Sequence, residues 1–195
     1  MKESTFNRMF AYSAILAGIF AFFYAYYFVI AKNVTLYSLF LLLFGLAALE
    51  VMVGLFGRLK SINEDIARLA LVLGVIGATG MAIHGGYDLA NAINPPSVMN
   101  TSLPSQVDPR GLLTFLFMGF GIIKISWLMS KDKNYTKGLY RTGFITGLLL
   151  LVIYIARMTV LDLKSPVLLY PVLVNGLIVN PLWYLWLGYS MLKKK

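Results

Sequence analysis

The sequence predicts an all-α integral membrane protein, built as a bundle of six transmembrane helices in a single domain, residues 1–195. Of the 195 residues, 59% are hydrophobic and only 13% are charged, and the mean hydropathy is +0.76. A soluble domain carries about a quarter charged residues. Long apolar runs alternate with short polar connections, and the basic residues gather in alternate connections, as topology determinants do.

The first three predicted spans are residues 9–31, 36–57 and 66–94. The first run is longer than the roughly 7–15 apolar residues of a signal peptide and ends in aromatic residues, so we interpret it as a retained helix. The third run exceeds the roughly 20 residues that cross a bilayer. Pro95-Pro96 ends it, because proline cannot continue a helix.

The second half contains predicted spans at residues 112–129, 139–163 and 167–192. The connection 95–111 is the longest and is rich in Pro, Ser and Asn, and its segment 108–111 (Asp-Pro-Arg-Gly) reads as a turn before the fourth span. Within the sixth span, Asn180-Pro181 predicts a kink, because the proline leaves the carbonyl of Leu177 without its usual partner.

The distribution of Lys and Arg predicts that both termini are cytoplasmic. Six spans place the termini on one side of the membrane. Twelve basic residues fall on that side: Lys2, Arg8, Arg58, Lys60, Arg68, Lys131, Lys133, Lys137, Arg141, Lys193, Lys194 and Lys195. The opposite connections hold only Lys32, Arg110 and Lys164.

Two ionisable residues are expected at one level in the cytoplasmic half. At 1.5 Å per residue, Glu50 lies roughly 22 Å and Lys124 roughly 20 Å from the outer ends of their spans. A charge that faces hydrocarbon costs several kcal/mol, so such residues normally pair inside the bundle. We therefore expect Glu50 and Lys124 to form a structural ion pair, with Glu50 as a proton carrier or general acid as the alternative.

A second polar layer is expected in the outer half. His84, Asp88 and Asn91 share one face of the third span at spacings of four and seven residues. Arg157 lies at a similar level on the fifth span and is the expected ion-pair partner of Asp88. The expected ligand-binding residues of this layer are Tyr87, Asn91, Tyr154, Arg157, Asn175 and Asn180. The alternative is a helix-end ion pair with no ligand.

Several kinds of chemistry are excluded. The chain has no cysteine, which excludes disulfides and thiolate ligands, and a single histidine. Zinc and haem sites need more ligands than this, so we expect no metal and no cofactor. The net charge of +9 is spread over the basic connections, so we expect no nucleic-acid partner.

These features predict a polar pocket inside the membrane, in the outer half of the bundle, that binds an apolar or amphipathic small molecule or lipid. His84, Asp88 and Glu50 are candidate catalytic groups for proton-transfer chemistry of the isomerase or cyclase type. A proton-coupled transporter, a receptor-like sensor and a structural subunit of a membrane complex are the alternatives. The expected location is the plasma membrane, with membrane lipid as a partner.

Overall fold

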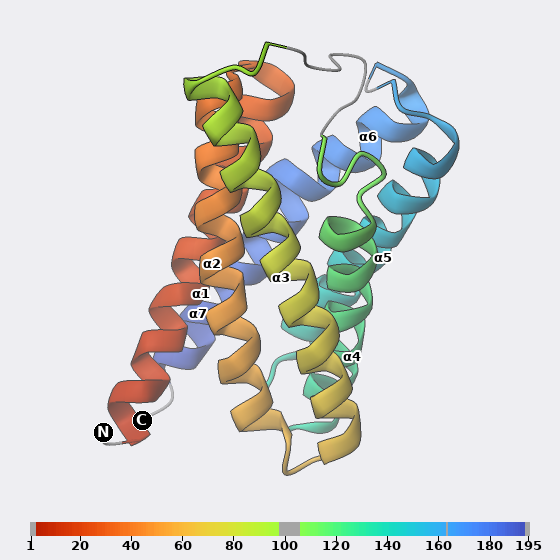
Figure 1. Ribbon diagram of the computed structural model, residues 1–195. Helices are drawn as coiled ribbons and strands as arrows, with labels where there is room; N and C mark the ends of the chain where they lie inside the picture. The colour runs from red at the N-terminus through yellow and green to blue at the C-terminus, as the bar shows by residue number, and fades with distance from the viewer. Residues whose placement is uncertain (1–2, 98–105, 163, 194–195) are drawn as a thin grey trace.

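The computed structural model describes residues 3–97, 106–162 and 164–193 (Figure 1), and all regular elements of these residues are helical. In chain order they are α1 (Glu3–Ala25), the π-helical segment η1 (Tyr26–Ile30), α2 (Val34–Leu59), α3 (Glu64–Ile93), the π-helical segment η2 (Leu112–Phe117), α4 (Met118–Lys131), α5 (Lys137–Thr159), α6 (Pro166–Val174), the π-helical segment η3 (Asn175–Val179) and α7 (Asn180–Lys193).

The prediction of six spans is confirmed. Six helical stretches are long and apolar enough to cross a membrane: Arg8–Ile30, Val34–Leu59, Glu64–Ile93, Leu112–Lys131, Lys137–Thr159 and Pro166–Lys193. The fifth ends at Thr159 rather than near the predicted residue 163, because Val160 is already extended, with φ −126° and ψ 118°. Residue 163 itself lies outside the described residues.

Large apolar side chains are exposed along the spans, as a lipid environment requires. Exposed examples are Leu16 and Ile19 on α1, Leu46 and Val53 on α2, Val72 and Ile83 on α3, Phe120 on α4, Leu148 and Val152 on α5, and Ile178 and Leu182 on the last span. In water these side chains would form large apolar patches, which soluble monomers rarely expose.

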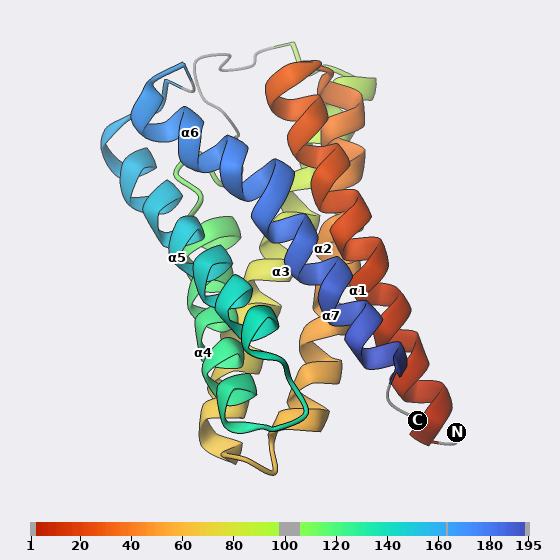
Figure 2. The same ribbon diagram turned by 180° about the vertical axis from the view of Figure 1, so that it is seen from behind.

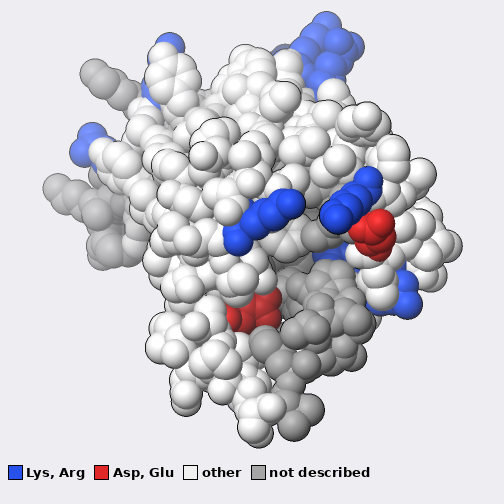
Figure 3. Space-filling model, turned by 90° about the horizontal axis from the view of Figure 1, so that it is seen from above, with Lys and Arg blue, Asp and Glu red and all other residues white. Residues whose placement is uncertain are grey.

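The two ends of the bundle differ in charge. We call the end with the α1–α2, α3–α4 and α5–α6 connections the upper end, and the end with both termini the lower end (Figure 1). The described basic residues of the lower end are Arg8, Arg58, Lys60, Arg68, Lys131, Lys133, Lys137, Arg141 and Lys193. Seen from above, the described part of the upper face shows only scattered charged side chains (Figure 3).

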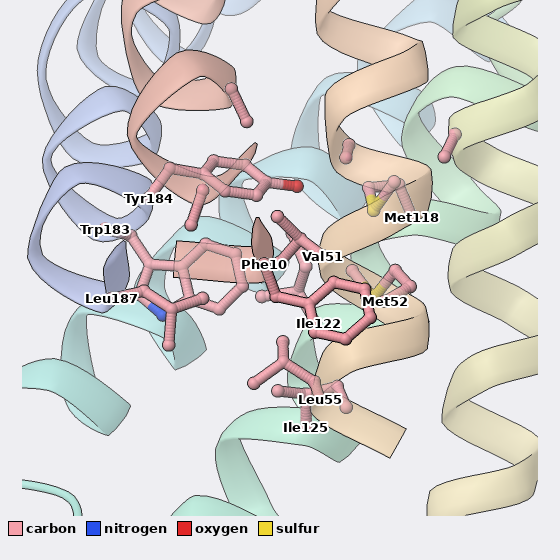
Figure 4. Packing of buried hydrophobic residues seen from close by; sticks show 14 of the residues in the cluster. Phe10, Val51, Met52, Leu55, Met118, Ile122, Ile125, Trp183, Tyr184 and Leu187 are labelled. Atoms are coloured by element: carbon pink, nitrogen blue, oxygen red, sulfur yellow. The ribbon is translucent and has the colours of Figure 1, made fainter. Parts of the chain in front are cut away.

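The last span crosses the bundle diagonally. Its α6 part begins beside α5 at the upper end, and its α7 part packs along α1 toward the lower end (Figure 2). The main core lies where α7 meets the other helices, with Trp183 and Tyr184 completely buried. In Figure 4 these two rings lie near Phe10 of α1, Val51 of α2 and Ile122 of α4.

Glycines allow α2 and α3 to pack with their backbones almost in contact. A Cβ added to Gly45 of α2 would lie 2.5 Å from the backbone nitrogen of Ala82, and one added to Gly85 of α3 would overlap the backbone nitrogen of Leu42. Small residues at such contacts are typical of membrane helices, whose association depends on close van der Waals packing. This contact holds the upper part of α3 against α2.

The neighbouring glycines of α3 provide a direct test of this contact. Gly85→Ala should lower the free energy of unfolding by about 1–3 kcal/mol, the usual cost of an overpacked core, because backbone atoms cannot move aside. In contrast, a Cβ at Gly86 would meet only Leu42 Cδ1 at 3.8 Å. Gly86→Ala should leave stability unchanged or slightly raise it, because alanine favours helix. Denaturant unfolding of the purified protein measures both, and equal effects would contradict the close contact.

Candidate functional site

One cavity lies in the upper half of the bundle, and side chains from all six spans line it. Its polar lining consists of Tyr24, Thr114, Arg157, Asn175 and Asn180, and the rest is mostly apolar. The empty space totals about 650 Å³, of which about 50 Å³ is wide enough for the centre of a water molecule. One water needs roughly 10–15 Å³ by this measure, so the cavity has room for a few water molecules.

All three π-helical segments of the described chain border this cavity. Phe28 comes from η1, Thr114 and Phe115 come from η2, and Asn175 and Gly176 come from η3. A π turn is bonded from residue i to i+5, is rare, and occurs frequently at functional sites. The irregular backbone of the bundle is therefore concentrated around one space.

The segment η3 explains how two asparagines of the last span reach the cavity together. The backbone N–H of Asn180 donates to the carbonyl of Asn175, directly before Pro181. The predicted irregularity at Asn180-Pro181 thus takes the form of a widened turn, which makes room for the proline ring. Bonding from i to i+5 brings residues five apart onto one face, whereas an α-helix would turn them well apart.

Arg157 is the charged side chain of the cavity lining. It is 3% exposed, and its guanidinium lies over the ring of Phe115, with Cζ 5.3 Å from the ring centroid. The side chain makes no hydrogen bond or ion pair with any described residue, and its Nε atom is enclosed without a partner. A cation is therefore buried against an aromatic face with its donors unmatched.

The predicted ion pair between Asp88 and Arg157 is not formed. Asp88 lies within ion-pair distance of His84 instead. The carboxylate whose charge acts on Arg157 is that of Asp108, without a direct ion pair between the two. Asp108 belongs to the turn before the fourth span and is buried, at 4% exposure. Comparing the depths of residues within the spans could not reveal the role of Asp108, because Asp108 lies in a connection between spans.

The turn 108–111 connects the start of the fourth span to the end of the fifth. Asp108 Oδ2 accepts the backbone N–H of Thr114 at 2.9 Å, and Arg110 Nη1 donates to the carbonyls of Arg157 and Met158 at 2.8 and 3.0 Å. The carboxylate satisfies a free donor at a helix start, and the guanidinium satisfies free acceptors at a helix end. The turn thus bonds to the backbone of both Thr114 and Arg157, two residues that line the cavity.

His84 and Asp88 form a separate polar pair on α3. His84 Nε2 lies 3.1 Å from Asp88 Oδ2, and both residues are 6% exposed. The contact lacks the alignment of a hydrogen bond, and His84 Nδ1 has no partner among the described residues. Neither residue lines the cavity.

Three of the six predicted ligand-binding residues share the cavity: Arg157, Asn175 and Asn180. The other three do not belong to its lining: Tyr87 is 45% exposed on α3, and Asn91 and Tyr154 are half-buried. Sequence reasoning missed Tyr24, which is hidden in a run of aromatic residues, and Thr114. The Asp-Pro-Arg-Gly turn was recognised, but not the capping role of its charges.

The predicted structural ion pair between Glu50 and Lys124 is also not formed. Glu50 is exposed on α2, and its carboxylate accepts a hydrogen bond from the hydroxyl of Ser13 on α1. No described cation lies within ion-pair distance of Glu50. The two residues share a depth, but α2 packs on α3 and α1 and hardly touches α4.

Nothing among the described residues resembles a metal site, since no three His, Asp or Glu side chains gather closely enough to hold an ion. Comparison with known proteins adds no assignment: no family model, no curated protein and no solved structure matches the chain significantly.

A double-mutant cycle tests the hydrogen-bond partner of Glu50. Ser13→Ala and Glu50→Ala should be coupled by about 1 kcal/mol in the free energy of unfolding, because each removes the same hydrogen bond. Glu50→Ala and Lys124→Ala should be additive within about 0.5 kcal/mol, as expected for residues without contact. Unfolding in denaturant supplies all values, and stronger coupling to Lys124 than to Ser13 would restore the predicted ion pair.

Proposed function

We propose that this chain is a membrane-embedded binding protein whose cavity holds an amphipathic small molecule or lipid. The supporting observation is a set of four enclosed polar atoms without a hydrogen-bond partner among the described residues. They are Arg157 Nε, Thr114 Oγ1, Asn175 Oδ1 and Asn180 Oδ1, and all four residues line the cavity. Each unsatisfied buried group costs about 1–3 kcal/mol, and the polar end of a ligand would remove this cost.

The remaining wall suits the apolar part of such a ligand. Phe28, Phe44, Met81 and Leu150 contribute apolar surface from four different spans. Small-molecule sites typically combine apolar walls with a few convergent polar groups, as here. Because the present space admits only a few water molecules, a larger ligand requires the lining side chains to move apart.

The geometry favours binding over acid–base catalysis. The three candidate catalytic residues, His84, Asp88 and Glu50, lie outside the cavity lining. Arg157 remains protonated under all ordinary conditions, so it can hold an anion but cannot exchange a proton. A binding, carrier or sensor role is therefore better supported than an isomerase or cyclase role.

We further propose that the chain resides in the plasma membrane with its lower end in the cytoplasm. The support is the concentration of Lys and Arg at the lower end, which the positive-inside rule associates with the cytoplasmic face. In this orientation the cavity lies in the outer half of the membrane.

Site-specific labelling tests the orientation. The chain contains no cysteine, so single cysteines can be introduced at Ser97, in the upper connection, and at Asn134, in the lower one. Both residues are exposed. In intact cells, an impermeant thiol reagent should label Ser97→Cys and leave Asn134→Cys unlabelled until the membrane is permeabilised. The reverse pattern would place the termini outside.

Photocrosslinking tests whether an amphiphile enters the cavity. A lysophosphatidylcholine with a diazirine in its acyl chain, added to the protein in nanodiscs, should label peptides that contain Phe28, Phe44 or Met81. Asn175→Leu should reduce this labelling several-fold, because it removes a polar group of the cavity. Asn91→Leu is the matched control: the same change on a residue outside the lining should have no effect. Labelling confined to lipid-exposed residues would contradict the proposal.

A further inference from the structure

We infer that the polar end of the ligand is an oxyanion, a carboxylate or a phosphate, held by the guanidinium of Arg157. This inference rests on the proposed function, because it names the chemical class of the ligand that the same cavity would bind.

The first argument is the unmatched state of Arg157. An arginine side chain carries five N–H donors and no acceptor. Arg157 is 3% exposed and forms no hydrogen bond or ion pair with any described residue. Its guanidinium instead lies over the face of the Phe115 ring. Carboxylate and phosphate oxygens match the planar fork of donors and can be bound through two parallel hydrogen bonds.

The second argument is the local balance of charge. Two arginines, Arg110 and Arg157, meet at the end of α5, and Asp108 is the carboxylate that acts on Arg157. One oxygen of that carboxylate already accepts the N–H of Thr114. The other nearby acid, Asp88, lies against His84. The described lining of the cavity itself contains Arg157 and no carboxylate, which favours an anion over a neutral or cationic ligand.

The third argument is the set of neutral groups that face the same space. The hydroxyl of Thr114 and the amides of Asn175 and Asn180 come from two different spans, and the three residues are 4%, 3% and 7% exposed. The Thr114 hydroxyl and the amide nitrogens of the two asparagines can donate to an oxyanion. The enclosed Oδ1 atoms of Asn175 and Asn180 are acceptors, which suit a hydroxyl group of the same ligand. An oxyanion beside Arg157 would thus find donors on the fourth, fifth and sixth spans together.

Binding measurements with matched probes test the inference. Native mass spectrometry of the protein in phosphatidylcholine nanodiscs compares oleoyl lysophosphatidic acid with monoolein, which has the same chain and glycerol but no phosphate. Glycerol phosphate supplies the head without a chain. We expect the phosphate lipid to bind at least about tenfold more tightly than monoolein, the smallest ratio that a charge-assisted hydrogen bond would give.

Two substitutions then locate the effect. Arg157→Gln should remove the preference for the phosphate lipid, and Arg157→Lys should keep part of it, because the charge remains and the fork is lost. Lys124→Gln is the control, since it removes a cation from a span without touching the cavity. If Arg157→Gln does not fold, the comparison of the probes on the unaltered protein still shows whether the phosphate group strengthens binding.

The outcomes separate the two proposals. Equal binding of monoolein and the phosphate lipid in the cavity would overturn the oxyanion and leave the binding function intact. Binding of glycerol phosphate as tightly as the phosphate lipid would support the oxyanion but overturn an amphipathic ligand. If no probe binds, the cavity holds water only, and both proposals fail.

Discussion

The hydrogen bonds of one turn determine the geometry of the upper half of the bundle. Asp108 satisfies a backbone donor at the start of the fourth span, and Arg110 satisfies backbone acceptors at the end of the fifth. Backbone N–H and C=O groups without partners at helix ends are costly where water is scarce. The hydrogen bonds of this turn satisfy such groups on two spans and so join the two spans. Gly111 makes the turn possible, because its φ of +75° would strain any residue with a side chain.

The architecture could be predicted because it depends on composition and on the length of apolar runs. Six runs of sufficient length, separated by polar connections, leave few alternatives in a bilayer. The helix starts follow local rules as well: Asn33, Asn63 and Thr136 each accept a hydrogen bond from a backbone N–H three residues later. These interactions lie within a few residues of one another and can be read from sequence.

The pairing of the buried charges could not be predicted, because depth says nothing about rotation around the bundle. Glu50 and Lys124 share a level, but the neighbour of α2 on the side of Glu50 is α1, which offers Ser13. The carboxylate whose charge acts on Arg157, that of Asp108, lies in a connection that no depth argument includes. The π-helical segments escape prediction for a similar reason: only the proline at 181 leaves a local signal, and η1 and η2 have none.

The two buried polar groups of the upper half differ in their partners. His84 and Asp88 are one turn apart on one helix, with 3.1 Å between Nε2 and Oδ2, so packing of that helix can account for their contact. Arg157 lies in the last turn of α5, where the helix dipole favours a cation by roughly 0.3–1 kcal/mol at exposed sites and by about 2 at most. A cation at the centre of a membrane helix costs about 2.5–3.5 kcal/mol on insertion-based scales, which are the lower of the available values. Arg110 already occupies the carbonyls at the end of that helix, so the dipole alone does not balance Arg157. His84 and Asp88 contact each other, whereas Arg157 has no ion-pair partner among the described residues. The cavity beside Arg157 is therefore a stronger candidate for function than His84.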